Sequence, residues 1–192
     1  MSDTPLAPVT PPARPHPRRR RASVPQLVLA ALLAVAAAAL VVLLERAVQL
    51  EAHVFAHAIP AVLGVSAVLG DHATLTIGAG GPTLFSMTVG LACSIVLLLV
   101  PFLLIAAALL SAGRISVLRA VFAVAVGAVL LEAVNTVRVV AIAALTLDDG
   151  VSGFGWGHTL VGSVIVLAGL LLATVGMLWI AARGRKGQAV TA

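Results

Sequence analysis

Four long stretches of almost uninterrupted apolar residues divide the chain, and polar residues gather between them. They cover residues 26–44, 91–110, 120–145 and 159–180. About 20 apolar residues in a helix cross the hydrocarbon core of a bilayer, so each stretch predicts a membrane-spanning helix. Pro101 predicts a kink in the second one. The pattern therefore indicates an all-α integral membrane protein with about four to five transmembrane helices.

The range of four to five reflects a weaker apolar stretch over residues 52–70. Pro60 and Gly64 interrupt it, and it carries His53 and His57 four residues apart. These features favour an interfacial or partly re-entrant helix over a full span. Two histidines at this spacing share one helical face and are a known metal-binding pattern. No third ligand is evident, so we predict neither a metal site nor any other cofactor.

Residues 71–89 change character, because threonines alternate with apolar residues on either side of the sequence Gly-Ala-Gly-Gly-Pro. This pattern predicts two short strands joined by a turn. Such a β-hairpin would lie outside the membrane, immediately before the second spanning helix. After the third helix, Asp148 and Asp149 precede a glycine-rich connection that leads to His158 at the start of the fourth helix.

Composition supports the membrane assignment and indicates an orientation. The chain has 61% hydrophobic and 10% charged residues, and its mean hydropathy is +1.15. Its net charge of +5 comes from basic residues that flank the apolar stretches, which argues against nucleic-acid binding. We predict a disordered basic cytoplasmic tail over residues 1–25, a membrane-embedded domain over 26–182 and a basic cytoplasmic tail over 183–192. A cleaved signal peptide is the competing interpretation of the first stretch, which is longer than a signal core of about 7–15 residues.

A cytoplasmic amino terminus satisfies the distribution of charge in a multi-pass protein of the plasma membrane. Arginines within 14–21, 114–119 and 183–186 then lie inside, while Asp71 and Asp148 lie outside, and Arg46 is the exception. Cys93 and His158 would both face outward. Arg138 would lie roughly 10 Å below that face, within reach of it.

Cys93, Arg138 and His158 are the parts of a cysteine acyl-transfer site. Cys93 is the single cysteine, and a helix start, Arg138 and His158 would each lower the pKa of its thiol. His158 would act as general base and then as general acid. Arg138 suits an oxyanion or a substrate carboxylate. Asn135, one turn away on the same face, could hydrogen-bond Arg138 or the substrate main chain.

Each residue also has a structural interpretation. Cys93 could simply pack in the core, and His158 could lie among lipid headgroups. Arg138 could pair with Glu132, which we treat as a supporting residue. Together these interpretations describe a non-catalytic membrane assembly or scaffold protein. A small transporter is a weaker alternative, because the chain contains no internal repeat.

The arrangement resembles the exosortase/archaeosortase family of membrane-embedded cysteine transpeptidases. The resemblance covers about residues 71–180 and rests on three features, which are the sequence Ala92-Cys93-Ser94, the Asn135-x-x-Arg138 motif, and His158. The family pattern continues with glycine after the serine, whereas this chain has Ile95.

The resemblance implies that Cys93 is the nucleophile, Arg138 the stabilising cation and His158 the acid/base, with Ser94 and Asn135 in support. It implies cleavage of a carboxy-terminal sorting signal on exported proteins through a thioester. It further implies transfer to a lipid or another amine acceptor.

Overall fold

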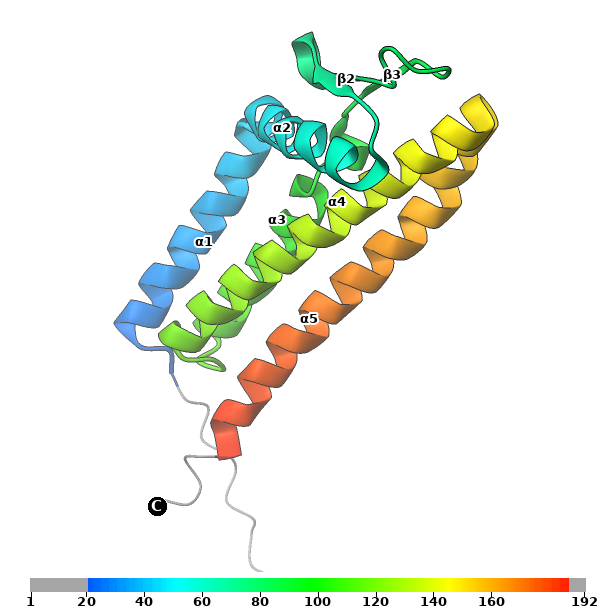
Figure 1. Ribbon diagram of the computed structural model, residues 1–192. Helices are drawn as coiled ribbons and strands as arrows, with labels where there is room; N and C mark the ends of the chain where they lie inside the picture. The colour runs from blue at the N-terminus through cyan, green and yellow to red at the C-terminus, as the bar shows by residue number, and fades with distance from the viewer. Residues whose placement is uncertain (1–20, 187–192) are drawn as a thin grey trace, which may run out of the picture.

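The computed structural model describes residues 21–186, with side chains described over 21–180. Most of the predicted tails, at 1–20 and 187–192, therefore lies outside the described residues. Helices dominate the fold (Figure 1). In chain order the main elements are α1 (Val24–Val42), α2 (Leu44–Leu63), β1 (Ala67–Leu69), β2 (Thr74–Ile77), β3 (Phe85–Thr88), α3 (Val96–Ser111), α4 (Val117–Trp156) and α5 (Gly162–Lys186).

Four helices form a bundle whose members run side by side. α1 packs on α3, α4 packs on α5, and α3 also contacts α4. α2 lies across one end of this bundle and packs on α4, as Figure 1 shows. Its apolar residues recur every three or four positions, so one face of α2 is buried against the bundle and the sheet. The buried apolar residues of that face are Val48, Ala52, Phe55 and Ile59.

The strands lie at the same end of the bundle and form a three-stranded antiparallel sheet in the order β1-β2-β3. The predicted hairpin is therefore confirmed as β2 and β3. Our expectation of a continuous weak helix over 52–70 is wrong at its end, because residues 67–69 form the third strand. α2 ends at Leu63, and Gly64 follows it with a φ of 68°, in the left-handed region that glycine tolerates best.

Two predicted boundaries also need correction. The second long helix begins at Val96, five residues later than expected, because a 3-10 turn over Leu91–Cys93 precedes it. The glycine-rich connection is helical: α4 continues to Trp156 and is broken only at Gly150, where φ is 60°. A π-helical turn over Gly157–Val161 then joins α4 to α5.

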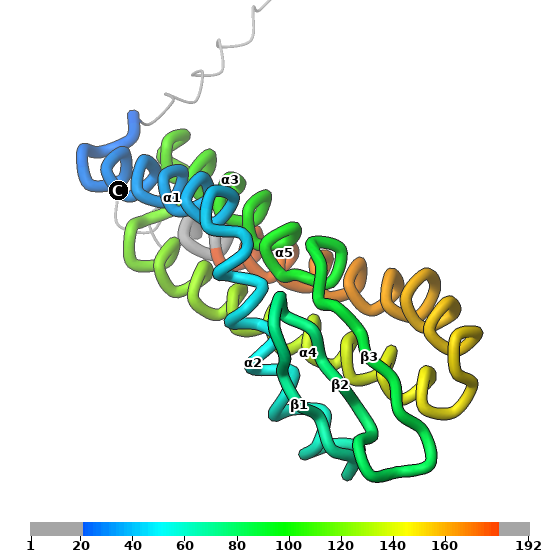
Figure 2. Tube along the Cα trace, turned by 90° about the horizontal axis from the view of Figure 1, so that it is seen from above, coloured from blue at the N-terminus to red at the C-terminus, as the bar shows by residue number. Residues whose placement is uncertain are grey.

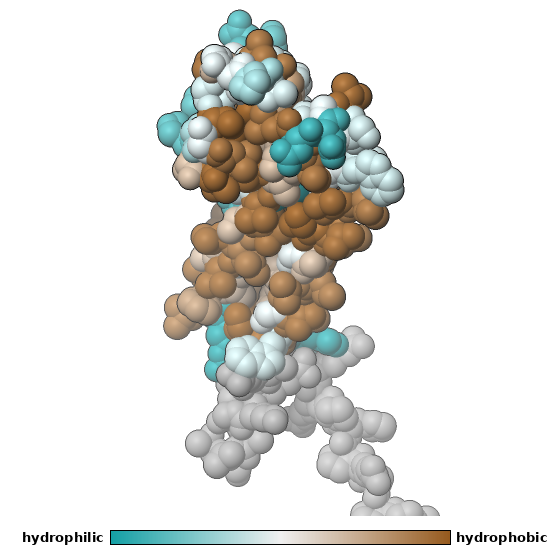
Figure 3. Space-filling model, turned by 45° about the vertical axis from the view of Figure 1, so that its right-hand side comes forward, coloured by the Kyte–Doolittle hydropathy of each residue, from teal (hydrophilic) through white to brown (hydrophobic). Residues whose placement is uncertain are grey.

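Among the described residues, two stretches are long and apolar enough to cross a membrane, namely Val24–Val42 and Val117–Ile180. The second contains both α4 and α5, while α3 is apolar but shorter. Large apolar side chains of α1, α4 and α5 are exposed, and apolar residues dominate the middle of the molecule (Figure 3). Because soluble monomers rarely expose such a surface, it indicates association with a membrane.

Candidate functional site

Cys93 ends the 3-10 turn and is held at the junction between the sheet and α3. Its side chain is 5% exposed and packs in the apolar cluster beneath the sheet, which includes Phe55, Leu75 and Val139. Ser94 then adopts an extended conformation, with ψ of 141°, before the chain enters α3. Cys93 therefore lies just before α3. The prediction that it lies in the first turn of this helix is wrong.

His158 reaches Cys93 from the π-helical turn between α4 and α5. Its Nδ1 lies 3.9 Å from the Sγ of Cys93, across 65 positions of sequence. The ring of Phe154 stacks on the imidazole, with centroids 5.5 Å apart and planes 8° from parallel. The fold thus brings two of the predicted residues together and fixes the plane of the imidazole.

Arg138 and Asn135 bind the main chain around Cys93. The Arg138 Nη1 donates to the Ala92 carbonyl over 2.7 Å, and the Asn135 Nδ2 donates to the Cys93 carbonyl over 2.8 Å. Asn135 is fully buried and Arg138 is 7% exposed. The two residues of the Asn135-x-x-Arg138 motif therefore hydrogen-bond the carbonyls of both peptide units that flank the Cys93 Cα atom.

Because Gly162 has no side chain, the Arg138 side chain can pack closely against α5 at this position. A Cβ atom at this position of α5 would lie 2.8 Å from Nε of Arg138 and 2.9 Å from the Gly157 carbonyl oxygen. Nε itself is buried without a hydrogen-bond partner among the described residues. The absence of a side chain at Gly162 therefore allows α5 and the guanidinium to approach closely.

Glu51 is a site residue that our sequence interpretation missed, because a charged residue just beyond an apolar stretch suggests an exposed helix end. It is instead 5% exposed on α2. Its Oε1 accepts from Ser94 Oγ over 2.6 Å, and its Oε2 accepts from the Ile95 N–H over 2.9 Å. Its spacing was the available signal, since residue 51 lies three positions after Val48 and four before Phe55, on the buried face.

Glu132 does not take the role that one alternative gave it. No ion pair joins it to Arg138 in the part of the chain that the structure describes, and its Oε1 is buried without a hydrogen-bond partner there. Arg138 is instead directed to the Ala92 carbonyl. Both residues lie on α4, so their pairing would not have joined two helices, and it is not found among the described residues.

The environment of Cys93 changes our expectation about its thiol. Burial raises the pKa of Cys93 above its ordinary value, and Arg138 and the Gly90 main chain only partly offset this rise, while Glu51 adds to it. Arg138 lowers this pKa as predicted, but burial outweighs it, so the predicted net lowering is wrong. At neutral pH the side chain of Cys93 is therefore a thiol.

A cavity of about 480 Å³ lies between the β3 segment and the end of α4. Figure 2 shows β3 at the edge of the sheet, next to the α4–α5 turn. The cavity is lined by Thr83, Leu84, Phe85, Ser86, Met87, Thr88, Thr146, Gly150, Val151 and Phe154. Phe154 lines this cavity and also stacks on His158, so one side chain lies between the cavity and the candidate site.

The histidine pair on α2 lies apart from this arrangement. His53 and His57 are exposed, and their Nδ1 atoms contact the main-chain carbonyls of Gln49 and His53. No cluster of three or more potential metal ligands was found among the described residues.

Comparisons with family models, curated proteins and solved structures gave no match. The site must therefore be interpreted from its own chemistry.

Proposed function

We propose that this chain is a membrane-embedded cysteine transpeptidase or endopeptidase, as its resemblance to exosortases and archaeosortases implies. The observation that carries the proposal is the 3.9 Å approach of the His158 Nδ1 to the Cys93 Sγ, from two distant elements. A thiol beside an imidazole is the minimal unit of cysteine acyl transfer. Arg138 lies close enough to lower the thiol pKa, so a permanent cation lies near the thiol.

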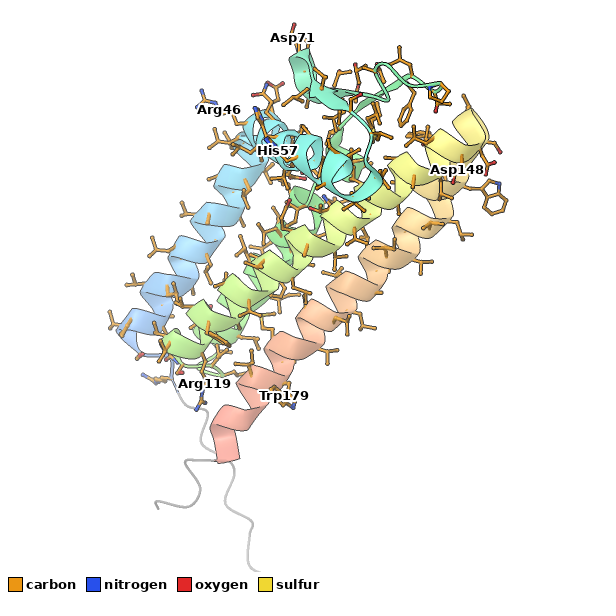
Figure 4. All side chains as sticks on the ribbon, viewed as in Figure 1. Arg46, His57, Asp71, Arg119, Asp148 and Trp179 are labelled. Carbon is orange, nitrogen blue, oxygen red and sulfur yellow. The ribbon has the colours of Figure 1, made fainter. Side chains whose placement is uncertain are left out.

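In this proposal α1, α3, α4 and α5 cross the membrane, while α2 and the sheet lie at its outer surface. The distribution of charge supports this placement. Figure 4 shows Asp71 and Asp148 at the end that carries the sheet, and Arg119 at the opposite end. Because basic residues favour the cytoplasmic side, the Arg119 end faces inward and the Cys93 site faces outward. The protein would then be a multi-pass protein of the plasma membrane.

The proposed reaction begins with a neutral thiol. The Cys93 Sγ attacks a peptide carbonyl carbon of the substrate while Nδ1 of His158 takes the thiol proton. Arg138 stabilises the developing negative charge. The C–N bond then breaks, and His158 returns the proton to the leaving amine, which leaves a thioester on Cys93. An amine acceptor or water attacks the thioester, His158 takes the proton of the attacking group, and the departing sulfur regains a proton.

The cavity beside β3 suits the extended stretch of substrate that precedes the cleaved bond. Val89 donates its N–H to the Ala73 carbonyl, so residues 73 and 89 form a hydrogen-bonded pair. Alternation along the ladder then directs the main-chain groups of Ser86 and Thr88 away from β2, toward the free edge. Extended peptides commonly bind by adding a strand to such an edge. A peptide paired there would run toward Cys93, five residues after Thr88.

The test uses candidate substrates coexpressed with the full chain. Reporters are proteins from the same genome that end in an apolar span followed by basic residues, each tagged at its amino end. We expect the native chain to shorten at least one reporter, and Cys93→Ala and His158→Ala to abolish that cleavage while both variants still accumulate in the membrane. His57→Ala is the matched control, because this exposed histidine has its side-chain hydrogen bond to the His53 carbonyl, away from Cys93. Cleavage that persists in Cys93→Ala would refute the proposal.

A non-catalytic scaffold remains the second candidate, because Cys93 is buried in an apolar cluster, as a packing cysteine would be. This alternative predicts that Cys93→Ala is functionally silent. It also predicts that no reporter is shortened in any membrane that contains the native chain. The same coexpression experiment therefore separates the two functions.

A further inference from the structure

Glu51 is a buried carboxylate for which the proposed reaction has no direct use. It lies on α2, 43 positions before Ser94 and 44 positions before Ile95, the two residues that donate hydrogen bonds to it. A third donor, Nδ2 of Asn135, lies 3.3 Å from Oε2. A carboxylate is seldom buried unless its oxygens are satisfied, and here donors from two other elements satisfy both oxygens.

The carboxylate caps the start of α3 from a separate helix. The first N–H groups of an α-helix lack partners within that helix, and Ile95 provides no side-chain cap of its own. Glu51 accepts from the Ile95 N–H directly, and Ser94 Oγ, which donates to Glu51, accepts from the Val96 N–H over 3.1 Å. A negative charge also interacts favourably with the amino-terminal end of the helix dipole. Glu51 thereby fixes where α3 begins.

This cap is continuous with the contacts around the nucleophile. The Nδ2 group of Asn135 that approaches Glu51 also donates to the Cys93 carbonyl. Arg138 binds the Ala92 carbonyl and Asn135 binds the Cys93 carbonyl. Glu51 binds the Ser94 hydroxyl and the Ile95 N–H, so four consecutive residues are held. No hydrogen bond is found between Glu51 and the Cys93 Sγ within the described residues, so Glu51 acts through the main chain.

We propose that Glu51 is the positioning residue of the nucleophile, whose carboxylate ties α2 to the Ser94–Ile95 segment and holds Cys93 against His158. This inference rests on the proposed function for its biological meaning. Its structural content stands independently, because the geometry of Cys93 can be measured without a substrate. Burial raises the pKa of Glu51, the hydrogen bonds from Ser94 and Ile95 lower it, and the nearby Glu132 adds to the rise. Cys93 is a further titratable group that interacts with Glu51.

The experiment measures how fast N-ethylmaleimide labels Cys93, the single cysteine, in membranes containing the full chain, as a function of pH. Glu51→Gln keeps an acceptor for the Ile95 N–H and removes a negative charge. Because that charge raises the pKa of Cys93, the labelling midpoint should move to lower pH. Glu45→Gln is the matched control, since Glu45 lies exposed on the same helix, and it should leave the midpoint unchanged.

Glu51→Ala tests positioning. In the native chain, His158→Ala should change the labelling rate because the imidazole contacts the thiol. After Glu51→Ala, adding His158→Ala should have no further effect, because Cys93 is no longer held in place. Reporter cleavage should fall about 100-fold in Glu51→Ala, as expected when several buried hydrogen bonds are lost.

Two results would overturn the inference, namely an unchanged labelling profile in Glu51→Gln, or full dependence on His158 in a folded Glu51→Ala protein. If Glu51→Ala does not accumulate, the Glu51→Gln profile decides alone. If the native chain cleaves no reporter but the labelling results are as expected, the proposed function fails and the positioning role of Glu51 stands.

Discussion

The main chain and the side chain of Cys93 are held in very different ways. Three groups bind the main chain on either side of this residue over 2.7–2.9 Å, through Arg138, Asn135 and Glu51. The side chain has one polar side-chain contact among the described residues, at 3.9 Å from the His158 Nδ1. Catalytic hydrogen bonds are often long before substrate binds. The main-chain contacts of Arg138, Asn135 and Glu51 thus form a rigid platform around Cys93. Polar contacts hold the sulfur atom itself far less tightly.

The largest expected effect comes from breaking the platform at Asn135. Asn135→Leu keeps the branching of the side chain at Cγ but removes the donor to the Cys93 carbonyl and to Glu51. Leaving buried acceptors without partners should lower the free energy of unfolding by about 2–4 kcal/mol. Thermal unfolding of the purified chain in detergent measures this loss. Equal stability of the variant and the native chain would show that the platform contributes nothing.

A smaller effect is expected when the platform is crowded. Gly162→Ala places a methyl group 2.8 Å from Arg138 Nε and 2.9 Å from the Gly157 oxygen. Overpacking of this kind costs about 1–3 kcal/mol, and reporter cleavage should fall because Arg138 must shift from the Ala92 carbonyl. Gly176→Ala on the same helix is the control, since a Cβ there meets no atom within 4 Å. Equal behaviour of the two variants would argue against a role for this close approach.

The substrate side can be tested separately through the edge of the sheet. Ser86→Pro removes an N–H that the register directs away from β2, and edge strands tolerate proline at such positions. Losing one intermolecular hydrogen bond should reduce reporter cleavage roughly tenfold without loss of stability. Ser86→Ala keeps the N–H and should retain cleavage. Undiminished cleavage by Ser86→Pro would exclude strand addition at β3.

The subtlest expected change is electrostatic. Arg138 lowers the pKa of Cys93, although burial keeps that pKa above its ordinary value. Arg138→Gln should therefore move the midpoint of N-ethylmaleimide labelling to higher pH, because the thiolate loses a stabilising cation. Arg119→Gln removes an exposed charge near the start of α4, at the end of the molecule away from the sheet, and should leave the midpoint in place. A shift to lower pH would contradict the assigned role of Arg138.

The local pattern of residues was sufficient for most of the secondary structure. Uninterrupted apolar stretches predict helices because every main-chain polar group must be paired in a lipid environment. Alternating threonines around a glycine-rich turn predict a hairpin, and β2 and β3 confirm it. The position of Cys93 beside this hairpin followed from its sequence neighbours. These features depend on residues that are close together in the chain.

Only the tertiary structure decided which polar groups meet and which are buried. Residue 51 is separated from Ser94 by 43 positions, so its role as a cap depends on how α2 crosses the bundle. The raised pKa of Cys93 likewise depends on the apolar cluster that excludes water from the thiol. The sequence by itself determined the helices, the hairpin and the reactive residue types. Long-range packing determined the geometry and electrostatics of the site, because desolvation and hydrogen bonding act between elements that are distant in sequence.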